Sequence, residues 1–118
     1  MSTELSSRLL IVDGDRPMRI LIREVLGEMG YVCTVAADPQ QAVRVLHRQP
    51  VDLLVTNSFS HSAHDVLAGS RPLLHLAHPL PVILCTPWPL TAADLQEAEV
   101  TAVVWKPFAL DDLVTTKP

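Results

Sequence analysis

Basic charge, cysteine and long apolar runs are all scarce in this chain of 118 residues. Lys and Arg number 9 against 13 Asp and Glu, which gives a formal net charge of −4. Without a basic surface, the chain alone is not expected to bind nucleic acid. No apolar run approaches the roughly 18 residues that a membrane span requires, and the polar start MSTELSSR is unlike a secretory signal peptide. We therefore expect a cytoplasmic protein without membrane contacts.

Cysteine occurs only at Cys33 and Cys85, and each lies inside an apolar run that is typical of a strand. We expect both thiols to be buried and reduced, as is usual in the cytoplasm. The sequence contains no internal repeat and no low-complexity tract. With 48% hydrophobic and 19% charged residues, its composition is that of a globular chain. We expect a single domain over residues 1–118.

Short apolar runs alternate with segments of helical spacing along the chain. A run such as Leu9 to Val12, which contains no polar residue, is typical of a parallel strand that is buried on both faces. Strands are expected at residues 9–12, 31–36, 51–56, 81–86 and 101–105.

The first two helices have clear boundaries in the sequence. Pro17 favours the first turn of a helix and Gly30 favours its end. The expected apolar face of this helix consists of Leu21, Val25, Leu26 and Met29. The tetrapeptide DPQQ at residues 38–41 predicts the start of a second helix, which ends near Gln49. Its inward residues are expected to be Ala42, Val45 and Leu46.

The helical signal weakens after residue 57. A helix over residues 63–68 is expected, interrupted by Gly69, Ser70 and Pro72. A second helical turn is expected over residues 72–77.

Two further helices are predicted near the end of the chain. Thr91 and Asp94 form a capping pair for a short helix that reaches Ala98. The last helix runs from Ala109 to about Thr116, which is unusually short, and we expect it to be natively shortened or truncated.

Strand and helix thus alternate along the chain, which predicts an α/β fold with a doubly wound parallel sheet. In such a sheet the ligand crevice lies at the carboxyl ends of the strands. The residues expected at this edge are Asp13, Gly14, Asp15, Asn57, Thr86 and Lys106.

Several of these segments together resemble the response-regulator receiver domain of bacterial two-component signalling. They are LLIVDGD at 9–15, Arg19, PVDLLVTN at 50–57, PVILCT at 81–86 and WKPF at 105–108. The resemblance covers nearly the whole chain. It implies a flavodoxin-like, five-stranded sheet of order 2-1-3-4-5 with helices on both faces. It also implies a role in phosphorelay signal transduction, with a histidine kinase and an effector or output domain as partners and a homodimer as a candidate assembly.

The family's chemistry implies four groups at the carboxyl edge of the sheet. An Asp at the end of the third strand attacks a phosphoryl group, and an acidic pair after the first strand holds Mg²⁺. A Thr or Ser ends the fourth strand and a Lys ends the fifth, and both contact the phosphoryl oxygens. A cation is needed because a carboxylate that attacks a phosphoryl group brings anion against anion.

This sequence departs from that pattern at its acidic positions. Asp13 matches the first acid of the pair, but Gly14 stands at the second, and the neighbouring Asp15 is not a ligand in the family pattern. Asn57 stands at the phosphoacceptor position. Three switch positions carry Thr86, Val103 in place of an aromatic residue, and Lys106, whose bond to Pro107 is cis in the family pattern. The loop after the third strand carries His61 and Asp65 where the family usually has Pro and Gly.

The leading hypothesis is therefore a degenerate receiver, or pseudo-receiver, that is not an enzyme. Asn57 is a poor nucleophile, and the loss of two carboxylates is expected to leave Mg²⁺ binding weak or absent. Lys106 is expected to lie near Asp13 and the Asn57 amide in a metal-free site. Such a module acts by protein–protein interaction that is independent of phosphorylation.

Two alternatives remain open at this point. One is a conventional phosphorelay receiver with another acceptor, such as Asp52, Asp13 or a His, although Asp52 starts its strand and thus lies at the wrong end of the sheet. The other is a small-ligand or metal sensor, because the segment 61–78 contains two His-x-x-His pairs. Solvated histidines are the favoured interpretation of that segment. Trp88 is interpreted equally well as a partner anchor or as a cover over the crevice.

Overall fold

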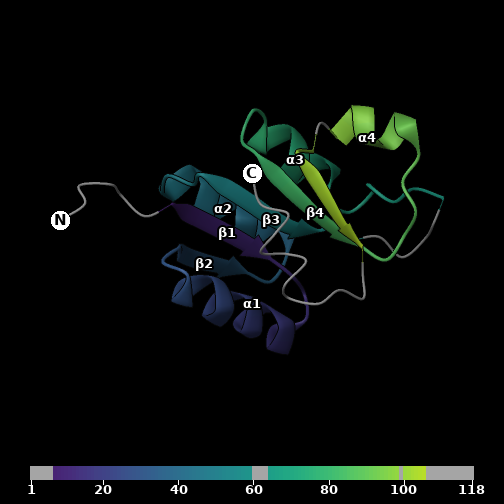
Figure 1. Cartoon of the computed structure of the whole chain (residues 1–118). Helices are drawn as coiled ribbons and strands as arrows, with labels where there is room; N and C mark the ends of the chain where they lie inside the picture. Colours follow the sequence, from purple (N-terminus) through teal and green to yellow (C-terminus); the bar gives the residue numbers. More distant parts are fainter. Residues whose placement is uncertain (1–6, 60–63, 99, 106–118) are drawn as a thin grey trace.

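Five parallel strands form one sheet with helices on both faces (Figure 1). The structure is a computed structural model, which describes residues 7–59, 64–98 and 100–105. The elements are β1 (Arg8–Val12), α1 (Arg16–Glu28), β2 (Val32–Ala36), α2 (Pro39–Arg48), β3 (Leu53–Asn57), α3 (Arg71–Ala77), β4 (Val82–Thr86), α4 (Ala92–Ala98) and β5 (Ala102–Trp105). The strand order is β2-β1-β3-β4-β5. The predicted fold class and strand order are confirmed.

The sheet separates two apolar cores, because successive strand residues point to opposite faces. On one face Leu10, Leu54 and Leu84 are fully buried beneath α2, α3 and α4. On the other face Ile11, Val55 and their neighbours pack against α1. Since both faces are covered, the strands are mostly apolar, which is why their positions could be predicted from apolar runs.

Helix α1 follows its predicted boundaries, but its apolar face differs from the expected one. Gly30 has a φ of +97°, which lets the chain turn back into β2. Ile22 and Leu26, four residues apart, are the buried residues of the helix. Leu21 and Met29 are 43% and 46% exposed. The expected apolar face therefore differs at these two residues, because the buried line of α1 runs through Ile22 and Leu26.

Helices α2 and α4 begin with the predicted caps. The backbone N–H of Gln41 donates to Asp38 Oδ1 at 2.8 Å. The Gln41 side chain in turn accepts from the backbone N–H of Ala37 at 2.9 Å. At α4 the backbone N–H of Asp94 donates to Thr91 Oγ1 at 3.1 Å, and the N–H of Thr91 donates to Asp94 Oδ2 at 3.0 Å. The pair at α4 is reciprocal, whereas at α2 the Gln41 side chain bonds Ala37 and not Asp38. In both helices the cap side chain satisfies a backbone donor that the first turn would leave without a partner.

The segment between β3 and α3 is not the helix that was expected. Over residues 64–70 the chain forms turns, and the helix begins only at Arg71. Pro72 explains the late start, because proline is tolerated in the first turn of a helix and not farther inside it. The expected helical turn over 72–77 is confirmed by α3.

The remaining predictions about the fold have mixed outcomes. Cys85 is buried as expected, whereas Cys33 is only partly buried, because it lies on the edge strand β2. Desolvation by burial raises the pKa of the Cys33 thiol, and the charge of Arg23 partly opposes that effect.

The predicted last helix and the Lys106–Pro107 bond lie outside the described residues. Within the described ranges, no helix is long and apolar enough to cross a membrane.

Gly69 provides a test of how tightly the segment after β3 is packed. A Cβ atom at Gly69 would lie 1.9 Å from the carbonyl oxygen of Phe59. The Gly69→Ala variant is expected to lose about 1–3 kcal/mol of unfolding free energy, because backbone must move to accommodate the methyl group. Urea denaturation measures this loss.

Gly27 is the matched control for that substitution. A Cβ atom at Gly27, inside α1, would meet no atom within 4 Å. Gly27→Ala should therefore raise the unfolding free energy by up to about 1 kcal/mol, through helix propensity. Equal stability of Gly69→Ala and the unmodified chain would contradict the packing described here.

Candidate functional site

The carboxyl ends of β1, β3 and β4 bring together three of the predicted site residues. Val12 lies opposite Thr56, and Asn57 lies opposite Cys85, in the parallel register of the sheet. Asp13 therefore follows β1 beside the end of β3. Thr86 ends β4 one step beyond Cys85. The edge carries one carboxylate, one amide and one hydroxyl at these three strand ends.

Asp13 is 4% exposed and is held by hydrogen bonds within its own loop. Its Oδ1 accepts from the backbone N–H of Asp15 at 2.8 Å. Its backbone carbonyl accepts from Nη1 of Arg19 at 2.9 Å, which ties the loop to α1. Asp15 itself is exposed and precedes α1. The Asp13 carboxylate is thus fixed in place, whereas the Asp15 side chain extends toward solvent.

Gly14 stands exposed between these two acids. A Cβ atom there would lie 3.7 Å from the carbonyl oxygen of Ala37 and 3.8 Å from Cε1 of Phe59, which are ordinary contact distances. The position could hold a side chain without strain. The absence of a carboxylate at this position is therefore a property of the sequence and is not imposed by packing.

Asn57 ends β3 and is partly buried. Its backbone carbonyl accepts from the Thr56 hydroxyl at 2.9 Å. Its side chain is a neutral amide, which offers hydrogen-bond donors and an acceptor but no charge. The strand end next to Asp13 therefore carries an amide. It can form hydrogen bonds with neighbouring groups, but it is not a nucleophile as a carboxylate would be.

Thr86 is fully buried, and its hydroxyl already has partners. The Ser58 hydroxyl donates to Thr86 Oγ1 at 3.1 Å. The backbone N–H of Trp88 donates to the same oxygen, also at 3.1 Å. Ser58, which is 3% exposed, was not identified from the sequence. Its place directly after a buried strand, level with Thr86, was the signal that could have found it.

Polar groups at the ends of parallel strands are also found in the family that matches this chain. A family model described as the response regulator receiver domain matches residues 9–116. The chain belongs to the response-regulator receiver family. Receivers act in two-component signalling, where they interact with kinases and output domains.

Solved receiver structures share the fold of this chain. The receiver domain of an HD domain-containing protein from Pseudomonas fluorescens Pf-5 is 22% identical, with a TM-score of 0.79, over 95% of this chain and 91% of that one. The receiver domain of the Francisella response regulator 1452 is 21% identical, with a TM-score of 0.78, over 93% and 92%. The chemotaxis protein CheY4 of Vibrio cholerae is 19% identical, with a TM-score of 0.77, over 95% and 96%. At these identities the likeness shows the fold alone.

Other predicted positions of this receiver lie away from the three strand ends or outside the described residues. Val103, a half-buried residue of β5, lies opposite Leu84 in the register. Lys106 and His61 fall outside the described residues. Asp52 precedes β3 at the far end of the sheet, where its Oδ2 accepts from the backbone N–H of Arg8 at 2.7 Å. The strand β3 separates Asp52 from the edge that carries Asp13, which disfavours it as an alternative acceptor.

Arg71 joins the turns after β3 to α4 by two ion pairs. It contacts Asp65 Oδ1 through Nη2 at 3.0 Å, and it also pairs with Glu97. Its hydrogen bond lowers the pKa of the Asp65 carboxyl, and the two carboxylates raise the pKa of Arg71. Both pairs are largely exposed, so each contributes little to stability. The sequence did not identify these pairs, because Glu97 lies 26 residues from Arg71 and the segment that holds Asp65 was expected to be a helix.

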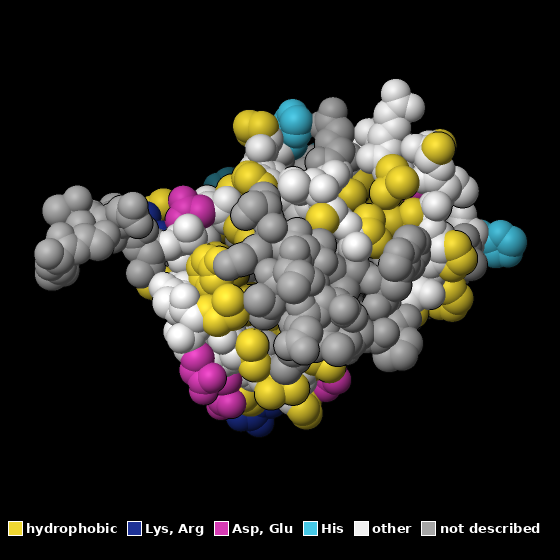
Figure 2. All heavy atoms as spheres, viewed as in Figure 1, with side chains coloured by type: hydrophobic (Ala, Val, Ile, Leu, Met, Phe, Trp, Pro, Cys, Tyr) yellow, Lys and Arg dark blue, Asp and Glu magenta, His cyan; other side chains and the backbone are white. Residues whose placement is uncertain are grey.

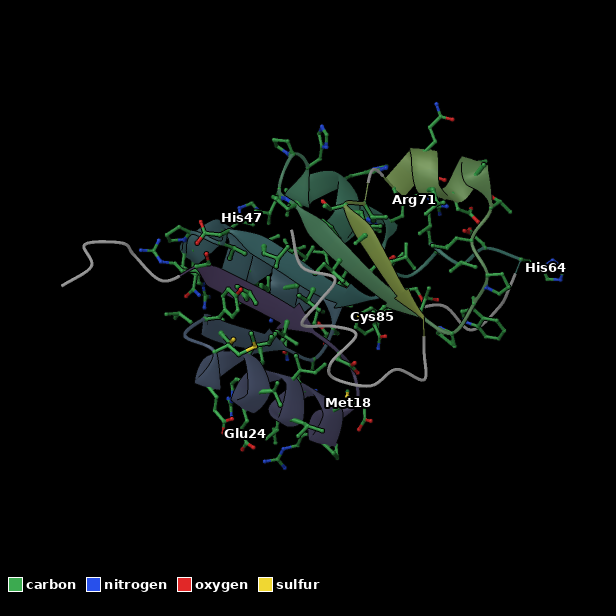
Figure 3. All side chains as sticks on the ribbon, viewed as in Figure 1. Met18, Glu24, His47, His64, Arg71 and Cys85 are labelled. Atoms are coloured by element: carbon green, nitrogen blue, oxygen red, sulfur yellow. The ribbon has the colours of Figure 1, made fainter. Side chains whose placement is uncertain are left out.

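The metal interpretation of the His segment gains no support from the described residues. Among them, no group of three or more His, Cys, Asp or Glu side chains could hold a metal ion. His64 lies in the turns before α3, and Figure 3 shows it far from His47 on α2. His75 lies within α3 and His78 caps its end.

The Ser58–Thr86 hydrogen bond can be tested by a double-mutant cycle. Ser58→Ala removes a buried donor, and Thr86→Val removes its acceptor. Each single substitution is expected to lower the unfolding free energy, and the double variant should lose about 1 kcal/mol less than their sum. Urea denaturation of the four proteins measures the coupling.

The same cycle with Ser70 in place of Ser58 is the control. Ser70 is also fully buried, but its hydroxyl contacts the carbonyl oxygen of Leu67. Ser70→Ala and Thr86→Val should therefore be additive. Additivity of the Ser58 and Thr86 substitutions would show that the two hydroxyls do not bond in solution.

Proposed function

We propose that this receiver works without phosphorylation, and that it transmits signals by binding protein partners. It is then an atypical receiver that lacks the phosphoacceptor carboxylate, and it is not an enzyme. The observation that carries this proposal is the neutral Asn57 amide at the end of β3, beside the buried Asp13.

The chemistry of phosphoryl transfer supports this proposal. A receiver carboxylate attacks phosphorus and forms an acyl phosphate, and covalent catalysis of this kind requires a nucleophilic oxygen. An amide oxygen carries no net charge, and its lone pairs are delocalised. With Asn57 at this strand end, the step has no competent nucleophile at the place where the family resemblance puts it.

The metal requirement leads to the same proposal. Mg²⁺ prefers oxygen ligands, and it is usually held by one or two carboxylates together with phosphate oxygens and water. The resemblance implies three acidic positions. Gly14 and Asn57 occupy two of them, so the Asp13 carboxylate is the one that remains. We therefore propose that Mg²⁺ is bound weakly or not at all by the unmodified protein.

The first test is direct phosphorylation by a small donor. The protein is incubated with acetyl phosphate and Mg²⁺, and its intact mass is measured. We expect no gain of a phosphoryl group, because the strand-end amide cannot form an acyl phosphate. The control is the double variant Gly14→Asp with Asn57→Asp, which carries both missing acids.

A stoichiometric, base-labile gain of one phosphoryl group by the unmodified protein would contradict the proposal. That result would instead favour a conventional receiver with a non-standard acceptor. Peptide mapping of the modified protein would then identify the residue.

The same double variant tests the metal site by itself. Gly14→Asp with Asn57→Asp should bind Mg²⁺ in calorimetry, because three carboxylates would then meet at one edge of the sheet. The Gly14 position can accept the side chain at ordinary contact distances. Either single variant should bind more weakly, and the unmodified protein should show little or no heat. Absence of binding by a folded double variant would show that these two positions do not face a common metal site.

A further inference from the structure

A groove lies at the end of the sheet where the parallel strands begin, opposite the strand ends that carry Asp13, Asn57 and Thr86. It has a volume of about 470 Å³ and lies between α2, α3 and the segments that lead into β3 and β4. We call it the α2–α3 groove. Most of its lining is apolar, and the residues are Leu46, His47, Gln49, Pro50, Val51, Leu76, Ala77, Pro79 and Leu80.

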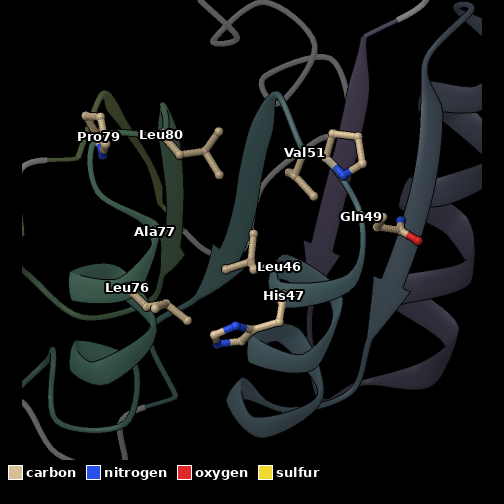
Figure 4. A pocket seen from close by; sticks show the side chains of 9 residues that line it. Leu46, His47, Gln49, Val51, Leu76, Ala77, Pro79 and Leu80 are labelled. Carbon is tan, nitrogen blue, oxygen red and sulfur yellow. The ribbon is translucent and has the colours of Figure 1, made fainter.

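Exposed apolar surface marks one wall of this groove. Leu76 of α3 is 45% exposed, and its side chain points toward His47 of α2 (Figure 4). Figure 2 shows hydrophobic side chains and a His side chain together above α3. A concave apolar surface of this kind is typical of a place where a partner places its own apolar side chains.

The two segments that line the groove contain basic and titratable side chains and no carboxylate. Residues 39–51 and 71–81 contain no Asp or Glu, although the whole chain has 13 of them and is acidic. Apart from Arg71, which pairs with Asp65 and Glu97, the cationic or titratable side chains of these two segments are exposed. They are Arg44, His47, Arg48, His75 and His78.

The carboxylate that is nearest in the sequence is Asp52, which follows Val51 directly. It keeps its negative charge, and its Oδ2 accepts from the backbone N–H of Arg8 at the start of β1. The exposed Arg44 and Arg48 of α2, which we call the basic rim, favour partners of complementary charge.

We propose that the α2–α3 groove binds an acidic amphipathic segment of a partner protein. Apolar side chains of that segment lie against Leu76 and Leu46, and its carboxylates face Arg44 and Arg48. This inference rests on the proposed function, because it names the chemistry of a partner. The groove and Asn57 lie at opposite edges of the sheet, so a partner can bind while the receiver site remains accessible.

The lining favours a protein segment over a small ligand. A small-molecule pocket usually has a few enclosed polar groups that fix the orientation of its ligand. Here the polar side chains of the lining, His47 and Gln49, are exposed, and Gln49 donates to Thr34 Oγ1 at 2.8 Å. Leucines at helical spacing on a partner segment would fill such a groove, and glutamates on its other face would meet the rim.

The experiment uses a labelled helical peptide as the probe. It has leucines at positions i, i+3, i+4 and i+7, and glutamates at its other positions. Fluorescence anisotropy should show saturable binding that weakens as salt is added, because exposed charges are screened. The same peptide with lysines in place of the glutamates should bind at least about ten-fold more weakly.

Substitutions in the protein locate the binding surface. Leu76→Asp should weaken binding about ten-fold or more, since it puts a charge against the apolar face of the peptide. Arg44→Glu with Arg48→Glu should also weaken binding about ten-fold at low salt. Leu21→Asp and Arg23→Glu on α1 are the controls, because Leu21 is 43% exposed on the other side of the sheet. The control variants should bind the peptide as the unmodified protein does.

Four outcomes would overturn the inference. They are absence of saturable binding, equal loss in Leu76→Asp and Leu21→Asp, binding to phosphatidylserine vesicles without binding to the peptide, and a dimer that Leu76→Asp dissociates in sedimentation. The last would assign the groove to a second copy of this chain. Thermal unfolding of each variant verifies that it folds, and Leu76→Gln replaces Leu76→Asp if the charge prevents folding.

Failure of this inference can be distinguished from failure of the proposed function. Phosphorylation by acetyl phosphate would overturn the proposed function and would leave peptide binding at the α2–α3 groove unchanged. Loss of peptide binding would leave the intact-mass result unchanged.

Discussion

The parallel register between β1 and β3 is the interaction on which the rest of this receiver depends. It places Val12 opposite Thr56, and thereby brings Asp13 to the end of the strand that carries Asn57. It also directs Leu10 and Leu54 toward the helices of one face. A shift of one residue would turn the side chains of the shifted strand to the opposite face, so core packing and the geometry of the strand ends are set by the same pairing.

The two ends of the parallel strands differ in character. All strands begin at one end of the sheet, which we call the amino edge, and finish at the other, the carboxyl edge. At the carboxyl edge, the ends of β1, β3 and β4 bring polar groups together, and the Asp13 carboxylate and the Thr86 hydroxyl bond nearby protein groups. At the amino edge, prolines and leucines lead into β3 and β4 and leave an apolar groove. The carboxyl edge suits polar chemistry, whereas the amino edge suits contact with an amphipathic surface.

Residues close in sequence were predicted well, and residues close only in space were not. The caps at Asp38 and at Thr91 could be predicted because each partner lies three residues away. Ser58 was missed because its partner, Thr86, lies 28 residues farther along. The expected helix over 63–68 was wrong because Pro72 favours a helix that begins at Arg71, and the turns before it lie close enough to place Gly69 against the backbone of Phe59.

The sequence by itself determined the five strands, the family and the neutral residues at the strand ends. Apolar runs, capping residues and strand-end positions act over a few residues, so Asn57 and Gly14 could be assigned to the edge without coordinates. Only the tertiary structure decided which groups those residues meet. Hydrogen bonds such as Ser58 to Thr86, the ion pairs of Arg71 and the apolar lining of the α2–α3 groove depend on how the elements pack, and packing joins residues that the chain keeps apart.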